Sequence, residues 1–178
     1  ESSYSWIIYV DCWEPDMWCW DQRVRQAGEM VVDNRGIVDN LYGEGATVRG
    51  FLNATPNSLG YGTNLDPRPY DPDGARALLA EAGFEGGKFP DGSPVEVDIW
   101  TWEAGDTPFL PEYSQLVADA WEKELDFDVT VHVGDASGVR QKWNNRQLAG
   151  GVIIRINETR YDGTSGWEGG WTNPDIAW

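Results

Sequence analysis

Apolar and polar residues alternate along several short segments of the chain, which is the pattern of half-buried β-strands. The segment 127–133 is a clear case, and its alternation predicts an inward face formed by Phe127, Val129, Val131 and Val133. Alternation also predicts a strand near 95–102, and β-rich apolar runs predict strands near 4–10 and 151–156, in addition to the one at 127–133.

Other segments repeat apolar residues every three or four positions, which predicts helices with one buried face. The strongest repeat lies within 111–124 and consists of Tyr113, Leu116, Val117, Ala120 and Trp121. Further helices are predicted near 21–33, 35–42, 72–82 and 137–148.

Local signals mark the ends of two of these helices. Asp71 is a predicted N-cap, Pro72 suits the first helical position, and Gly83 suits a left-handed stop. Asn34 is the predicted cap of the helix at 35–42.

The order of the elements predicts the fold class. Strands and helices alternate after residue 94, which predicts an α/β fold with a mixed sheet flanked by helices. Residues 43–69 are dense in Gly, Pro and Asn and predict a long surface excursion. Ligands of such sheets bind beyond the carboxyl ends of strands, where Trp100, Trp102 and Glu103 fall.

The charge of the chain narrows the range of partners. Thirty acidic and thirteen basic residues give a formal net charge of −17, a field that repels nucleic acid phosphates. No apolar run is long enough for a membrane helix. No signal peptide is visible at Glu1, so we expect either that one was removed or that the sequence starts inside a longer protein.

Two cysteines and one histidine limit the metal chemistry. Cys12, Cys19 and His132 cannot supply four Cys or His ligands for a structural zinc ion, and we expect no cofactor. A disulfide between the cysteines would suit an oxidising compartment, and two free buried thiols are the alternative. Eleven tryptophans exceed ordinary core usage and predict an aromatic surface in addition to the core.

Two long motifs carry a family resemblance. The stretch RVRQAGEMVVDNRGIVDNLYGEGATVRG (23–50), followed by YDPDGARALLAEAGF (70–84), resembles the peptide/nickel/oligopeptide class (family 5) of extracellular solute-binding proteins of ABC importers. The later segments LDFDVTVHV and RYDGTSGWEGGW keep the order of that family. NNRQLAGGVIIRINETRYDG is longer than its counterpart in the family.

The resemblance implies a role and a location. Residues 1–178 would form one lobe of a two-lobed binding protein, periplasmic or extracellular, with the other lobe absent. The full-length protein would hand a small solute to a membrane ABC permease without chemical conversion. An isolated lobe also exposes its lobe–lobe surface, which predicts possible dimers.

Candidate ligand-binding residues gather at the predicted strand ends and in the Gly-Trp segment: Trp100, Trp102, Glu103, Trp167, Glu168, Trp171 and Asn173. In peptide-binding members an Asp and an Arg near this segment hold the peptide ends, but the matching positions here are Gly170 and Thr164. Trp rings stack on sugars or cations. We therefore expect a sugar-like or cationic solute rather than a free peptide.

Two alternative functions remain open at this point. Glu103 and Glu168 could act as the paired carboxylates of a carbohydrate-active enzyme. A protein-interaction module is the second alternative, based on the exposed lobe surface.

Overall fold

The computed structural model describes residues 3–43, 46, 48, 67–103, 105 and 109–159, except the side chains of 3–5 and 157–159. Its centre is a four-stranded mixed sheet in the order β1-β4-β2-β3. The strands are β1 (Ser3–Val10), β2 (Glu96–Trp102), β3 (Asp128–Gly134) and β4 (Val152–Thr159). β1 runs antiparallel to β4, and β2 runs parallel to both β3 and β4. The predicted α/β class with a mixed sheet is confirmed.

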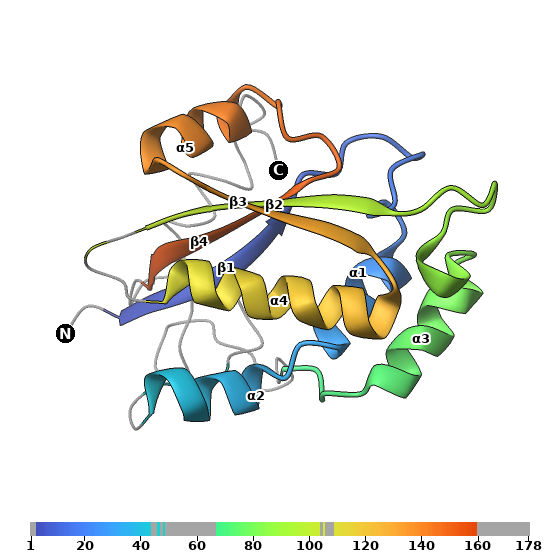
Figure 1. Cartoon of the computed structure of the whole chain (residues 1–178), viewed down its shortest axis with the longest axis horizontal. Helices are drawn as coiled ribbons and strands as arrows, with labels where there is room; N and C mark the ends of the chain where they lie inside the picture. Colours follow the sequence, from blue (N-terminus) through green and yellow to red (C-terminus); the bar gives the residue numbers. More distant parts are fainter. Residues whose placement is uncertain are drawn as a thin grey trace.

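Helices cover both faces of this sheet (Figure 1). One face carries α5 (Ala136–Asn144). The opposite face carries α4 (Leu110–Leu125), with α1 (Gln22–Met30), α2 (Asn34–Ile37) and α3 (Pro72–Glu81) on the same side. A π-helical turn (Val38–Tyr42) continues α2, and a 3-10 turn (Glu85–Gly87) follows α3. Each predicted strand and helix is present, although α1 and α5 end earlier than the periodicity predicted.

The core lies between the sheet and α4. Tyr113, Val117 and Trp121 of α4 are buried there, as their helical spacing predicted. The indole N–H of Trp121 donates to the carbonyl of Gly28 in α1 at 2.9 Å, which joins the two helices. Leu116 is 38% exposed, so the predicted stripe is narrower than the sequence pattern.

The predicted caps of α3 are confirmed and that of α2 is wrong. The Asp71 side chain accepts from the amide of Gly74 at 3.0 Å, and Gly83 has a φ of +88°. Asp33 caps α2 by accepting from the amide of Gly36 at 2.9 Å. Asn34 instead accepts from the hydroxyl of Tyr113 at 3.0 Å, a tertiary contact that local sequence does not reveal.

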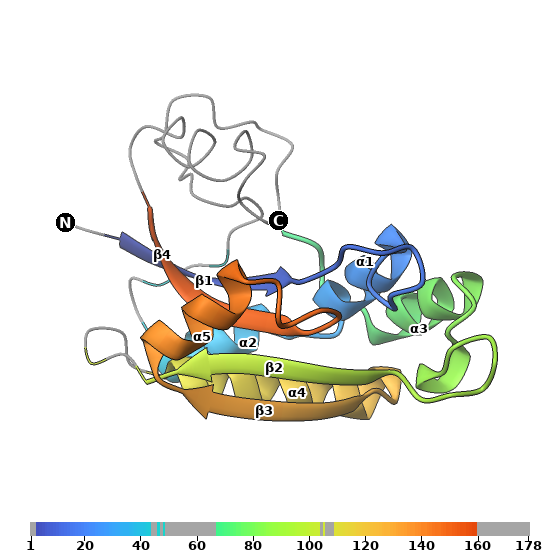
Figure 2. The same ribbon diagram turned by 90° about the horizontal axis from the view of Figure 1, so that it is seen from above.

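Strand β3 is one of the two edge strands of the described sheet, and this explains another wrong prediction. Val133 was predicted to point inward but is 53% exposed, because an edge strand is covered on fewer sides than a central one. Phe127, just before the strand, is buried as predicted. Figure 2 shows β3 at the border of the sheet, beside β2.

Cys12 and Cys19 form a disulfide with their Cα atoms 5.9 Å apart. The bonded alternative is therefore the one observed. The bond closes the loop between β1 and α1, and a loop of this length contributes about 2–3 kcal/mol in chain-entropy estimates. A structural disulfide is typical of proteins that work outside the reducing cytoplasm.

Candidate functional site

The carboxyl ends of β2, β3 and β4 are where the topology predicts a ligand site. The connection from β2 to β3 passes through α4 on one face of the sheet, and the connection from β3 to β4 passes through α5 on the other face (Figure 2). Consecutive connections therefore leave the same sheet edge toward opposite sides. Open α/β sheets bind ligands at such a switch point.

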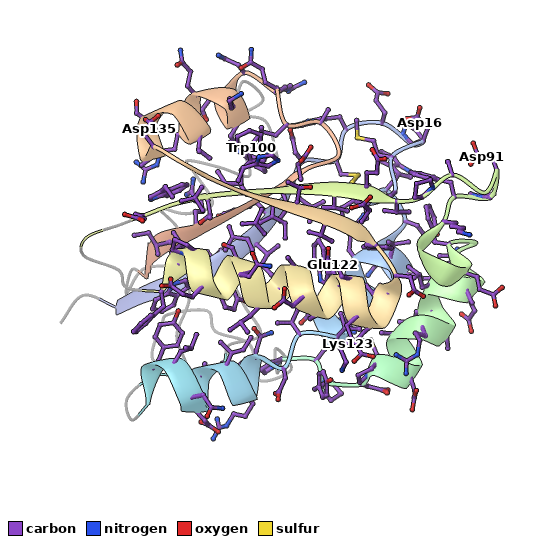
Figure 3. All side chains as sticks on the ribbon, in the orientation of Figure 1. Asp16, Asp91, Trp100, Glu122, Lys123 and Asp135 are labelled. Atoms are coloured by element: carbon purple, nitrogen blue, oxygen red, sulfur yellow. A yellow bond between two sulfur atoms is a disulfide. The ribbon has the colours of Figure 1, made fainter. Side chains whose placement is uncertain are left out.

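Trp100 lies on the α5 side of β2, where neighbouring side chains already contact its ring (Figure 3). The imidazole of His132 stacks on the indole at 4.2 Å between ring centroids, with an interplanar angle of 17°. The Lys142 ammonium lies 4.9 Å from the centroid of the same indole. Trp100 is half-buried among these groups, so it offers less open ring surface than the sequence suggested.

His132 also belongs to a polar pair across two strands. Its Nε2 lies 2.6 Å from Oδ1 of Asp98 on β2, and both side chains are partly exposed. The pair fixes the imidazole in the orientation that stacks on Trp100.

Trp102 and Glu103 lie at the end of β2. The Trp102 side chain is 2% exposed, and the guanidinium of Arg140 from α5 lies 5.2 Å from its ring centroid. Glu103 is exposed directly after the strand. Trp102 is therefore a core residue at the carboxyl end of β2. A ligand contact by Trp102 or Glu103 remains a prediction.

A second aromatic group, formed by Trp6, Tyr42 and Phe109, lies on the α4 side of the sheet. Trp6 of β1 contacts Tyr42 with ring centroids 4.5 Å apart, and Tyr42 contacts Phe109 at 5.8 Å. Burial, with a smaller contribution from Glu112, raises the pKa of the Tyr42 hydroxyl to about 12. The phenol is therefore neutral at physiological pH and available as a hydrogen-bond donor.

Phe109 is notable for its backbone as well as its ring. It has a φ of +71° immediately before α4, and its side chain is 40% exposed. A left-handed conformation is unfavourable for a bulky residue, and such positions cluster at functional sites. Sequence analysis missed this aromatic group, because its members come from three distant segments and no local periodicity links them.

Four candidates from the Gly-Trp segment, Trp167, Glu168, Trp171 and Asn173, lie outside the described residues. The same holds for Gly170 and Thr164. Their part in binding remains a prediction.

Two properties of the described residues limit what this region can do. These residues contain no group of three or more His, Cys, Asp or Glu side chains that could hold a metal ion. Among them, no helix combines the length and apolar character needed to cross a bilayer.

Comparison with known proteins identifies the family to which this chain belongs. Residues 3–173 match the family described as bacterial extracellular solute-binding proteins, family 5 Middle. The chain belongs to this family, and the predicted resemblance is confirmed. As a member of an extracellular family it works outside the cytoplasm, as predicted, and the non-enzymatic character of the family fits the expected absence of catalysis.

Particular relatives can be named. The chain is 31% identical to heme-binding protein A of Haemophilus influenzae over 104 residues, which cover 57% of this chain and 17% of that protein. It is 29% identical to the dipeptide-binding protein of Escherichia coli over 107 residues, covering 58% and 18%. The oligopeptide-binding protein OppA superposes with a TM-score of 0.73 at 18% identity, covering 88% of this chain and 25% of that structure.

These matches cover only a small part of each relative. The chain spans less than one fifth of the length of the two curated relatives. The prediction that residues 1–178 form a single lobe remains a prediction.

Proposed function

We propose that this chain forms part of the ligand-capturing region of a receptor that delivers a peptide-like solute to an ABC importer. The family match over residues 3–173 is the observation that carries this proposal. The topological switch point, with aromatic groups on both of its sides, supplies a place for the ligand.

The names of the relatives favour a peptide-like solute over the sugar-like or cationic solute that the sequence suggested. One of them binds dipeptides, another binds heme, and a structural neighbour binds oligopeptides. The contacts of Trp100 also favour a peptide-like solute over a sugar. A sugar would stack on the indole, but His132 and Lys142 already lie against that ring.

A titration followed by two-dimensional NMR of the indole N–H groups tests this proposal. We expect a tripeptide such as Ala-Ala-Ala to shift a subset of these signals and cellobiose to leave them unchanged. If one lobe supplies half of the free energy of a micromolar receptor, the dissociation constant is about 1 mM. Shifts caused by cellobiose without shifts caused by the peptide would overturn the proposal.

Affinity gives an independent check. Submicromolar binding of a peptide by this chain alone would contradict the half-site argument, and calorimetry would detect it. Delivery to a permease and dimerisation through an exposed lobe face are further parts of the proposal. Sedimentation of the purified chain over a range of concentrations would test the dimer.

A further inference from the structure

The segment that carries α5 differs from the rest of the chain in its charge. Residues 136–157 contain four basic residues and no acidic one, whereas the whole chain contains thirteen basic and thirty acidic residues. Three of the four basic residues, Arg140, Lys142 and Arg146, are exposed. We call these three residues the α5 patch. It is a basic region on the surface of a strongly acidic protein.

Each cation of the α5 patch lies over a tryptophan ring. The distances from cation to ring centroid are 5.2 Å for Arg140 and Trp102, 4.9 Å for Lys142 and Trp100, and 4.2 Å for Arg146 and Trp13. Trp100 and Trp102 are two residues apart on β2, so they face the same side of the sheet and lie about 7 Å apart along the strand. Trp13 belongs to the loop between β1 and α1. The α5 patch therefore extends from the carboxyl end of β2 to the loop that follows β1.

The charges of the α5 patch are not neutralised within the part of the chain that the structure describes. None of its cations forms an ion pair with a described carboxylate. Two acids on this side of the sheet have other partners, because Asp98 pairs with His132 and Asp135 caps α5. Burial raises the pKa of Asp11, and the charge of Arg146 is the smallest of the opposing effects. A tryptophan ring holds a cation in place without neutralising its charge.

We propose that the α5 patch docks an acidic segment of a partner protein. Carboxylates are the groups that guanidinium and ammonium donors bind most strongly among protein side chains. Cations that are already held over rings lose less side-chain freedom when a partner binds. This interaction is separate from capture of the solute, and it does not depend on which solute the protein binds.

The net charge of −17 favours a short acidic segment over a larger anionic surface. A membrane or a nucleic acid meets the repulsive field of the whole molecule. A segment of a few residues meets mainly the local field of the α5 patch, because salt screens the more distant charges. The partner is therefore a protein with exposed Asp or Glu residues in a row.

The experiment uses hexaglutamate with blocked ends as the probe. NMR of the labelled chain follows the indole N–H signals of Trp13, Trp100 and Trp102, which lie beneath the three cations. We expect hexaglutamate to shift these signals at about 0.05 M sodium chloride and to lose this effect at about 0.5 M, where screening is stronger. Uncharged hexaglutamine should leave the signals unchanged.

A variant that combines Arg140→Gln, Lys142→Gln and Arg146→Gln removes the α5 patch. We expect it to bind hexaglutamate about eightfold more weakly, because each exposed charge pair contributes a factor of about two. A second variant, with Arg140→Lys and Arg146→Lys, keeps all three charges. It should retain most of the binding, which separates loss of charge from damage to the fold.

The matched control combines Arg35→Gln, Arg68→Gln and Lys88→Gln. These residues are exposed on other segments, and the control changes the net charge by the same amount. It should weaken binding by less than about twofold. Equal weakening by the control and by the variant without the α5 patch would overturn the proposal, because binding would then follow net charge alone.

Two other outcomes also overturn the proposal. One is the absence of any response to hexaglutamate at low salt. The other is binding of phosphatidylglycerol vesicles or of DNA through the α5 patch without binding of hexaglutamate, which would assign the patch to a different class of partner. Neither outcome affects the proposed capture of a solute.

Discussion

Several positively charged side chains in this protein lie against tryptophan rings. Three cations of the segment around α5 lie over tryptophans: Arg140 over Trp102, Lys142 over Trp100 and Arg146 over Trp13. The tryptophan content suggested an aromatic surface, but these rings serve as supports for positive groups. In an acidic protein this arrangement keeps cations in place without pairing each of them with a carboxylate.

Asp11 offers the sharpest prediction at the level of one residue. Its side chain is fully buried directly after β1. Burial raises the pKa of this carboxyl, with smaller opposing effects from Trp13, Leu148 and Arg146. Because the folded pKa lies above the unfolded one, the folded state loses stability as the pH rises through the interval between them.

We therefore expect Asp11→Asn to raise the free energy of unfolding at pH 7 by about 1 kcal/mol. The gain should shrink toward pH 3, where the aspartate is protonated in both states. Urea unfolding at several pH values measures this, with the exposed Asp16→Asn in the same loop as control (Figure 3). A destabilised Asp11→Asn at pH 7, with Asp16→Asn unchanged, would show that the carboxylate is favourable there.

The elements follow the sequence closely, because their signals are local. Periodicity located the strands and most helix faces, and Asp71 and Gly83 marked the ends of α3. The sequence also located Trp100, Trp102 and Glu103 at the end of β2. It could not reveal Phe109 beside Tyr42 or Arg140 over the Trp102 ring, because these contacts exist only after distant segments pack together.

The corner after α3 provides a prediction at the level of elements. Gly86 and Gly87 both have positive φ values, +65° and +68°. A Cβ on Gly87 would lie 2.1 Å from the carbonyl oxygen of Asp126, whereas a Cβ on Gly86 would meet nothing within 4 Å. The close approach holds the 3-10 turn against the junction of α4 and β3.

We expect Gly86→Ala to cost about 1 kcal/mol of stability from backbone strain alone. Gly87→Ala carries the same strain and also forces two backbones apart, so its cost should exceed about 3 kcal/mol. Thermal and urea unfolding of the two variants side by side measure the difference. Equal losses of stability would mean that the backbone around Asp126 moves away from the new Cβ of residue 87 at no cost.

The molecule as a whole carries a charge that opposes its own compaction. With a net charge of −17, the folded chain concentrates repulsion that the unfolded chain spreads over a larger volume. Salt shortens the range of this repulsion, from about 14 Å at 0.05 M to about 4 Å at 0.5 M.

Raising sodium chloride between these limits should therefore increase the melting temperature by about 2–4 °C, which corresponds to roughly 1 kcal/mol for a chain of this size. Scanning calorimetry provides the measurement. Glu122 of α4, Glu96 of β2 and Asp128 of β3 are exposed, and no described cation pairs with them. A variant with all three changed to amides should respond less, and an identical response would attribute the effect to something other than net charge.

The pairing of β1 with β4 has a consequence for how the protein is made. Among the described strands β1 is the first to be synthesised, yet its partner β4 is the last of them, and the register joins Ile7 to Arg155. Because β4 also separates β1 from β2, a partly synthesised chain lacks the middle of its sheet and exposes two strand edges. Such intermediates are prone to aggregate. The described sheet therefore cannot be completed before β4 has been synthesised.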